Sequence, residues 1–267
     1  MRKLKQKYNT KLSVEEQLLL KGLDDHELDI FSFEELHQLE LIEVIFLQSA
    51  LEKLVRNGWL KRIEKGKYCR HNFYNELAIA NLLVEDGAIA YWSALNFHGL
   101  TEQFPHTVFV QTTHQKKNKE VFGVQYQFVK IKEKKRVGVI VDWYNEYPIQ
   151  VTDIEKTIVD CFDLPEYSGG FAELLRAFDE ASLDGDKLIA YCRAIDSVSA
   201  IKRMGYLAEV LQKDGLEAFR EYAESVVNSS PTPFDPFGIK KGSVQKKWKL
   251  VMNIEEKDIL AIIGKIY

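Results

Sequence analysis

The densest group of chemically active side chains is a run of cations between residues 53 and 70. This stretch has seven basic residues against one acidic residue, so its net charge is 7 − 1 = +6, whereas the whole chain carries −4. The basic residues are Lys53, Arg56, Lys61, Arg62, Lys65, Lys67 and Arg70. Because cations at this density can neutralise several phosphates, we expect this stretch to bind a polyanion with an affinity that falls steeply with salt.

The same stretch predicts the elements that would hold these cations. Ser32 is a candidate N-cap for a first helix, and Gly58 is a stop signal for a second one. Gly66 lies in a short turn between two strand patterns. The expected elements are helices at residues 31–39 and 43–57 and strands at residues 59–63 and 67–70. Two helices followed by a hairpin are typical of a winged helix-turn-helix, in which a helix enters the major groove and the hairpin meets the phosphates.

The second expected helix has two distinct faces. Its apolar face is formed by Leu47, Ala50, Leu51, Leu54 and Val55. The opposite face is polar, and we predict that four of its residues lie in or beside the major groove, namely Gln48, Ser49, Lys53 and Arg56. The residues predicted to contact phosphates from the hairpin are Lys61, Arg62, Lys65 and Lys67.

The first turn of that helix departs from this pattern. Val44, Ile45 and Phe46 stand where polar side chains usually contact bases, and we expect them to pack against the N-terminal helix or a partner. Two other interpretations of the stretch remain open: the cations form only a solvated face, or the module docks onto a protein instead of DNA.

Bulk properties indicate an ordinary globular protein. The chain has 267 residues, of which 46% are hydrophobic and 28% charged. We predict an α+β protein with a winged helix-turn-helix at residues 1–72 and a C-terminal domain of mixed sheet and helices at residues 73–267. The basic start lacks the apolar segment of a secretory signal, no run is long enough for a membrane span, and the three cysteines fit no zinc or disulfide spacing. We therefore expect a cytoplasmic protein with reduced thiols.

Alternation and helical periodicity predict the remaining elements. The expected strands are at residues 107–112, 124–129, 137–143, 149–151 and 246–252, and a polar connection is expected at 114–120. The expected helices are at residues 12–22, 75–84, 88–97, 153–163, 171–182, 185–195, 197–212, 216–227 and 254–263.

An enzymatic function has little support in the sequence. No phosphate-binding loop is present, because Ser168-Gly169-Gly170 lacks the Lys-Ser/Thr that would follow. A group of acids with a lysine allows a metal-dependent nuclease as an alternative, and its members are Asp142, Glu146, Asp153, Glu155 and Lys156. However, acids at 153–155 are also expected at a helix start because of the macrodipole. We therefore expect no enzyme, no metal and no cofactor.

Four strings in the chain resemble the AbiEi-type antitoxins, which are transcriptional regulators of phage-defence systems. The strings are GWLKRIEKGKY (58–68), YWSALNFHGLTEQFPHTVFVQT (91–112), VTDIEKTIVDCFDLPEYSGGFAELLRA (151–177), and an ending with Asp235-Pro236, Gly242 and Lys247-Trp248. The likeness covers about 230 residues, from the helix-turn-helix to the end of the chain.

This resemblance implies two functions. The N-terminal domain would repress its own operon by binding inverted repeats in double-stranded operator DNA, with two copies cooperating as a dimer on one site. The C-terminal domain would counteract a toxin of the nucleotidyltransferase class encoded beside it. Some such systems act without a stable complex, so the resemblance does not imply a tight interface with the toxin.

Overall fold

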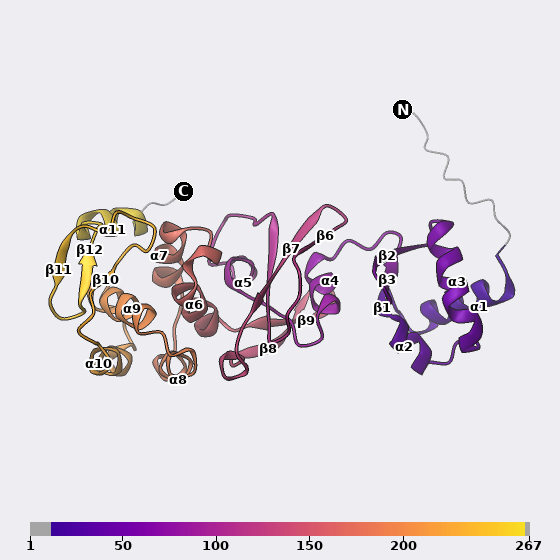
Figure 1. Ribbon diagram of the computed structural model, residues 1–267, viewed down its shortest axis with the longest axis horizontal. Helices are drawn as coiled ribbons and strands as arrows, with labels where there is room; N and C mark the ends of the chain where they lie inside the picture. The colour runs from indigo at the N-terminus through magenta and orange to yellow at the C-terminus, as the bar shows by residue number, and fades with distance from the viewer. Residues whose placement is uncertain (1–11, 265–267) are drawn as a thin grey trace, which may run out of the picture. The chain divides into compact units, whose positions relative to one another are not determined.

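The protein has a mixed α+β fold. The computed structural model describes residues 12–264, and the chain divides into two compact units, the first ending at Glu85 and the second beginning at Asp86 (Figure 1). The sequence-based boundary at residue 72 precedes this division by one helix, α4 (Glu76–Leu83), whose buried Leu77, Ile79 and Leu83 lie in the first unit. The start of the chain, on which the expectation of no secretory signal rests, lies largely outside the described residues.

The first unit combines helices with a small antiparallel sheet. Its elements are α1 (Val14–Asp25), β1 (Ile30–Ser32), α2 (Phe33–Gln38), α3 (Val44–Arg56), β2 (Leu60–Glu64), β3 (Lys67–Arg70) and α4. The strand order is β1-β3-β2, with Phe31 opposite Tyr68. The apolar core joins the inner faces of α1 and α3 to this sheet, and Leu19, Leu51 and Tyr68 are almost fully buried in it.

Local capping signals define where the first helices begin. Ser13 with Glu16 and Ser32 with Glu35 each form a capping box, in which the serine hydroxyl accepts from a backbone N–H and the glutamate accepts in return. The cap at Ser32 was predicted and is confirmed. Gly66 has a φ of +76° in the hairpin turn, a conformation that favours glycine.

The second unit is built on a six-stranded sheet. Its strands are β4 (Ala88–Ile89), β5 (Thr107–Thr112), β6 (Lys119–Val121), β7 (Val124–Lys130), β8 (Val139–Tyr144) and β9 (Tyr147–Thr152). The order is β6-β7-β5-β4-β9-β8, with parallel pairing of β5 to β7 and of β4 to β9. The sheet is therefore mixed, as predicted.

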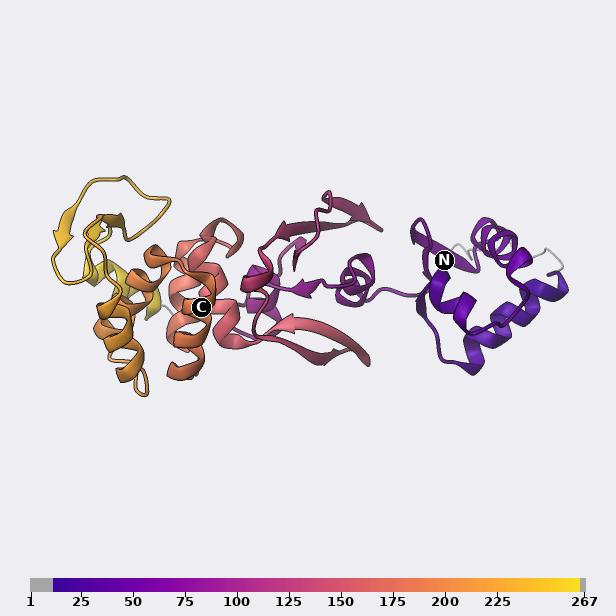
Figure 2. The same cartoon turned by 60° about the horizontal axis from the view of Figure 1, so that its bottom comes forward.

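Helices form a layer beside this sheet (Figure 2). They are α5 (Tyr91–Phe97), α6 (Ile154–Asp163), α7 (Phe171–Glu180), α8 (Gly185–Ile195), α9 (Val198–Val210), α10 (Glu217–Ser225) and α11 (Glu256–Ile263). A second three-stranded sheet comes between α10 and α11 in the chain, with β10 (Thr232–Pro233), β11 (Ser243–Gln245) and β12 (Leu250–Met252). The largest core cluster runs through this layer and includes the fully buried Trp248.

Four sequence-based elements were wrong in part, and in two of them pairing with distant segments determines the structure. Residues 31–32 belong to β1, because they pair with β3, and α2 begins only at Phe33. Ala88 and Ile89 form β4 instead of a helix start, because they fill the gap between β5 and β9. The supposed polar connection contains β6, and residues 246–249 form a turn between β11 and β12.

Candidate functional site

The polar face of α3 is exposed, as its sequence predicts. Gln48 and Ser49 are on the surface, while Leu47, Ala50, Leu51 and Leu54 are buried. The Gln48 side chain donates to Glu52 (Nε2 to Oε1, 2.7 Å), and the Ser49 hydroxyl donates to the Phe46 carbonyl oxygen at 2.9 Å. Both polar contacts are local and exposed, so neither side chain is bound into the core.

Three of the predicted cations have partners within the first unit. The ammonium of Lys53 lies 3.8 Å from the Glu16 carboxylate. Lys61 places its ammonium 4.4 Å from the centroid of the Tyr74 ring. Arg62 donates from Nε to the Glu64 carbonyl oxygen at 3.3 Å. Lys53 and Arg62 remain exposed and Lys61 partly so, which leaves them able to meet an external anion.

Lys67 is more firmly held than the other predicted hairpin cations. Its ammonium donates to the Leu83 carbonyl oxygen at 2.8 Å and lies 3.0 Å from the Glu64 carboxylate. Arg70, at the end of β3, is also engaged, because it pairs with Asp24 and donates to the Leu28 carbonyl oxygen. These two residues hold the hairpin in place.

Arg56 and Lys65 differ from the other cations. Arg56 lies in the last turn of α3, Lys65 lies in the hairpin turn, and both are exposed. Among residues 12–264, neither makes a hydrogen bond or an ion pair with another side chain. The helix dipole favours a cation such as arginine in the last helical turn, and this effect does not require an acidic partner.

The first turn of α3 presents three consecutive apolar side chains to solvent. Val44 is 53% exposed, Ile45 75% and Phe46 43%. The preceding Glu43 is the N-cap residue, yet its side chain accepts no capping hydrogen bond. Most of the triplet's surface therefore does not pack against the N-terminal helix, and its packing against a partner stays a prediction. A shallow groove beside it is lined by His37, Glu40, Ile42, Glu43, Val44 and Leu47.

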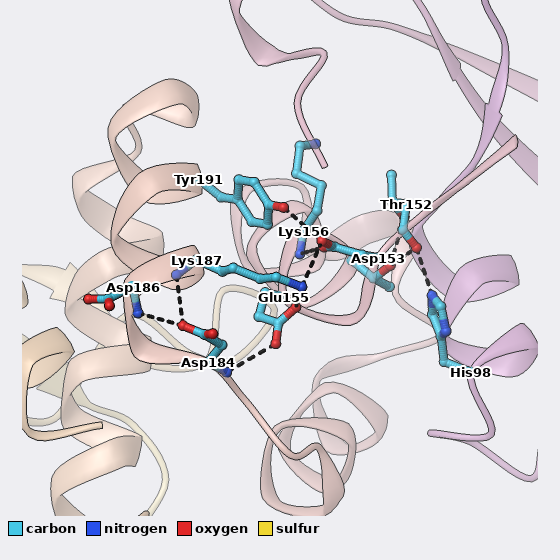
Figure 3. Close-up of polar contacts among 10 residues, drawn as sticks. His98, Thr152, Asp153, Glu155, Lys156, Asp184, Asp186, Lys187 and Tyr191 are labelled. Atoms are coloured by element: carbon cyan, nitrogen blue, oxygen red, sulfur yellow. Dashed lines mark hydrogen bonds and ion pairs between the residues drawn. The ribbon is translucent and has the colours of Figure 1, made fainter. Parts of the chain in front are cut away.

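The acids proposed for a nuclease bind groups of the protein itself (Figure 3). Asp153 caps α6 by accepting from the Lys156 backbone N–H at 2.9 Å, and it accepts from the Tyr191 hydroxyl at 2.7 Å. Glu155 accepts from the Asp184 backbone N–H at 3.0 Å. The Lys187 ammonium lies between the two carboxylates, 3.4 Å from Asp153 and 3.3 Å from Glu155.

Lys156 lies behind this cluster, with no exposed side-chain surface. Its ammonium pairs with Asp160 one turn later and lies 3.4 Å from the Gln111 side-chain oxygen. Burial raises the pKa of Asp160 to about 6, although the neighbouring Lys156 charge works in the opposite direction. Because the pair is sealed from solvent, it is placed to organise the core around α6.

The remaining acids do not join this cluster. Asp142 is opposite Ile149 in the β8–β9 pair, whereas Asp153 follows the far end of β9, where Thr152 is opposite Val139. Glu146 is exposed in the turn between the two strands. Within residues 12–264, no three His, Cys, Asp or Glu side chains form a group that could hold a metal ion.

The buried side chains include all three cysteines, Ser93 and Phe234. Burial raises the pKa of the Cys69 and Cys192 thiols to about 12, which disfavours the reactive thiolate. Ser93 donates to the Thr107 carbonyl oxygen and accepts from the Phe109 N–H, so its hydroxyl joins α5 to β5. Phe234 is buried between the Phe171 and Tyr206 rings.

Sequence reasoning missed the partners of the acids. Lys187 and Tyr191 come from α8, more than thirty residues from Asp153, and no local signal links them. The Lys156–Asp160 pair could have been found, because the two residues are spaced i,i+4 on a helix.

No helix within residues 12–264 combines the length and apolar character needed to cross a membrane.

Comparisons with known proteins bear on the fold. No family model matches the sequence. No curated protein matches it either. Among solved structures, the chain is similar to the RV2827C protein from Mycobacterium tuberculosis, with a TM-score of 0.67 and 18% sequence identity. The match covers 96% of this chain and 97% of that chain. At this identity the likeness shows that the two proteins share a fold.

Proposed function

We propose that the first unit is a winged helix-turn-helix that binds double-stranded DNA. The observation that carries this proposal is the unengaged pair Arg56 and Lys65, one at the end of α3 and one in the hairpin turn. The element order α1-β1-α2-α3-β2-β3 and the strand order β1-β3-β2 support it, because a helix followed by a hairpin offers two elements to one duplex.

Each proposed DNA contact has a chemical basis. Arg56 and Lys65 would pair with phosphates, as would Lys61 and Arg62, and these contacts position the protein without reading sequence. Gln48 is suited to bind an adenine edge, since an amide can donate and accept at once. To do so it must give up its hydrogen bond to Glu52. Lys67 is left out of this set, because its ammonium holds the hairpin to α4.

We further propose that the protein is an antitoxin that represses its own operon. Four strings that resemble AbiEi-type antitoxins support this role, and they lie in both units. The partner would be a nucleotidyltransferase-type toxin encoded beside it, and two copies would occupy an inverted repeat in the promoter. Both functions would be exercised in the cytoplasm.

A salt titration tests the DNA-binding proposal. The full-length protein is mixed with duplex DNA taken from directly upstream of its coding sequence, and affinity is measured across a range of salt concentrations. Loss of two phosphate contacts in the Arg56→Ala/Lys65→Ala variant should flatten the slope of log affinity against log salt by about 1.8, or 0.9 per contact. Lys117→Ala, an exposed change in the second unit, is the matched control.

Two results would favour other functions. Cleavage of the duplex with Mg²⁺, lost in Asp142→Ala, would indicate a nuclease. Absence of measurable affinity at low salt would indicate a module that docks onto protein. The antitoxin role has its own test. Expression of the neighbouring toxin gene without this chain should stop growth. Co-expression of this chain with the toxin should restore growth.

A further inference from the structure

The most unusual surface of the first unit is the apolar first turn of α3. Three consecutive residues, Val44, Ile45 and Phe46, are exposed there, and Ile45 is the most exposed of them at 75%. Isolated apolar residues on a surface are common, but a contiguous group at the start of one helix indicates a contact site.

Helical spacing places this turn on the face that carries the polar residues. Ile45, Ser49 and Arg56 follow one another at i, i+4 and i+11, which aligns them along one side of α3. The buried residues of the helix, among them Leu47 and Leu54, lie on the opposite side. The apolar turn and the unengaged Arg56 therefore face the same occupant.

The charge around this face identifies the kind of occupant. The net charge of residues 53–70 is +6, and Arg56 and Lys65 have no acidic partner within the described part of the chain. An apolar protein ligand would gain nothing from these cations, whereas a nucleic-acid duplex offers phosphates to them. In the major groove, the duplex also offers one apolar group, the C5 methyl of thymine.

We propose that Ile45 and Phe46 read thymine methyl groups in the major groove. This inference rests on the proposed DNA-binding function. It adds to that function a preference for particular base pairs. Aliphatic and aromatic side chains have no donor or acceptor for base edges, so contact with a methyl group is the readout available to them. The first turn of such a helix is the part that comes closest to the bases. The preferred site would therefore have A·T pairs under this turn.

The test replaces thymine with uracil, which lacks only the methyl group and pairs identically. The upstream duplex is made with either base, and the affinity of the full-length protein is measured for both. We expect weaker binding to the uracil duplex, by about fourfold for each methyl contacted, which corresponds to the transfer of one methylene-sized group. The Ile45→Ala and Phe46→Ala variants should lose affinity for the thymine duplex and should discriminate less between the two duplexes.

Controls make the outcomes distinct. Val14→Ala removes an exposed apolar side chain from α1 and should change neither affinity. Equal, salt-sensitive affinity of the unaltered protein for both duplexes would overturn this inference and leave DNA binding intact. Failure to bind either duplex at low salt would overturn the proposed function and this inference with it. If Ile45→Ala instead lowers the mass of the free protein in light scattering, the turn is an interface between copies and the inference is wrong.

Discussion

The ammonium of Lys67 donates to the carbonyl oxygen of Leu83, and this single bond ties the hairpin strand β3 to the last residue of α4. The two residues are sixteen positions apart, and the donor is only 25% exposed. Such a bond also brings a donor to the last turn of a helix, where the intrahelical hydrogen bonds end. Lys67 and its neighbour Lys65 are therefore expected to have different roles, although both are lysines in one hairpin.

Substitution of the two lysines should have different effects, one on stability and the other on DNA binding. Lys67→Met should lower the free energy of unfolding by about 1–2 kcal/mol, because it removes a charge-assisted hydrogen bond between β3 and α4. Lys65→Met should leave stability unchanged and reduce the salt slope of DNA binding by about 0.9. Urea denaturation and affinity titration measure the two effects. Equal effects of both changes on binding, with no change in stability, would contradict this division.

Glu43 offers a way to stabilise α3. Its side chain makes no capping bond, so Glu43→Ser should supply one to an N–H group of the first turn. The expected gain is about 1 kcal/mol of unfolding free energy. Loss of the negative charge beside the proposed DNA face should also raise affinity. Glu85→Ser, which removes an exposed acid outside α3, is the control for charge alone, and a larger gain from it would refute the capping argument.

The Lys156–Asp160 pair predicts strong coupling in the second unit. Lys156→Met should destabilise the protein by about 3–5 kcal/mol, because it leaves a buried carboxylate without its counter-charge. The double variant Lys156→Met/Asp160→Leu should regain much of that loss, since two apolar side chains of similar volume replace the pair. A double-mutant cycle in denaturant measures the coupling. Additive losses would mean that the two residues do not depend on each other.

The same carboxyl group predicts a pH dependence. The pKa of Asp160 is about 6 in the folded protein, above its usual value, so the folded state holds its proton more tightly than the unfolded chain does. The stability that this group contributes is thus present at acid pH and is lost as pH rises from about 4 to about 6, on the order of 2–3 kcal/mol. The unfolding free energy of the unaltered protein minus that of Asp160→Asn should fall across this window. A constant difference would show that the group does not titrate there.

Gly205 predicts a packing defect. A Cβ at this position in α9 would lie 2.3 Å from the Trp248 ring, too close for any side chain. Gly205→Ala should therefore destabilise the second unit by about 1–3 kcal/mol or displace the tryptophan, despite the better helix propensity of alanine. Tryptophan fluorescence and thermal unfolding report the two effects. Ser182→Ala, at an exposed position, is the control, and an unchanged melting temperature in Gly205→Ala would contradict the contact.

Sequence patterns predicted the elements whose signals are local. Serine caps, glycine stops and the amphipathic face of α3 lie within a few residues of the structure they define, and helices α6 to α11 were all expected. Strand β4 was missed because it exists through pairing with segments far along the chain, whereas β6 was missed because its polar residues hide a short hairpin with β7. Ile89, for example, takes its conformation from Val110 on one side and Val151 on the other.

The candidate site could be predicted to a similar extent. The cations were evident from residue type alone, but their partners were not, since Lys67 meets Leu83 and Lys53 meets Glu16 across the unit. The exposure of Ile45 was also unexpected, because an apolar residue beside a buried stripe is normally assumed to be buried with it. Distinguishing unengaged cations from structural ones requires tertiary contacts that no residue pattern encodes.

The close packing of the Trp248 ring against Gly205 has a consequence during protein synthesis. Until Trp248 has left the ribosome, the second unit lacks the indole ring that packs against Gly205 in α9. A chain cut short before that codon would keep its cationic N-terminal unit and lose the tight centre of its partner unit.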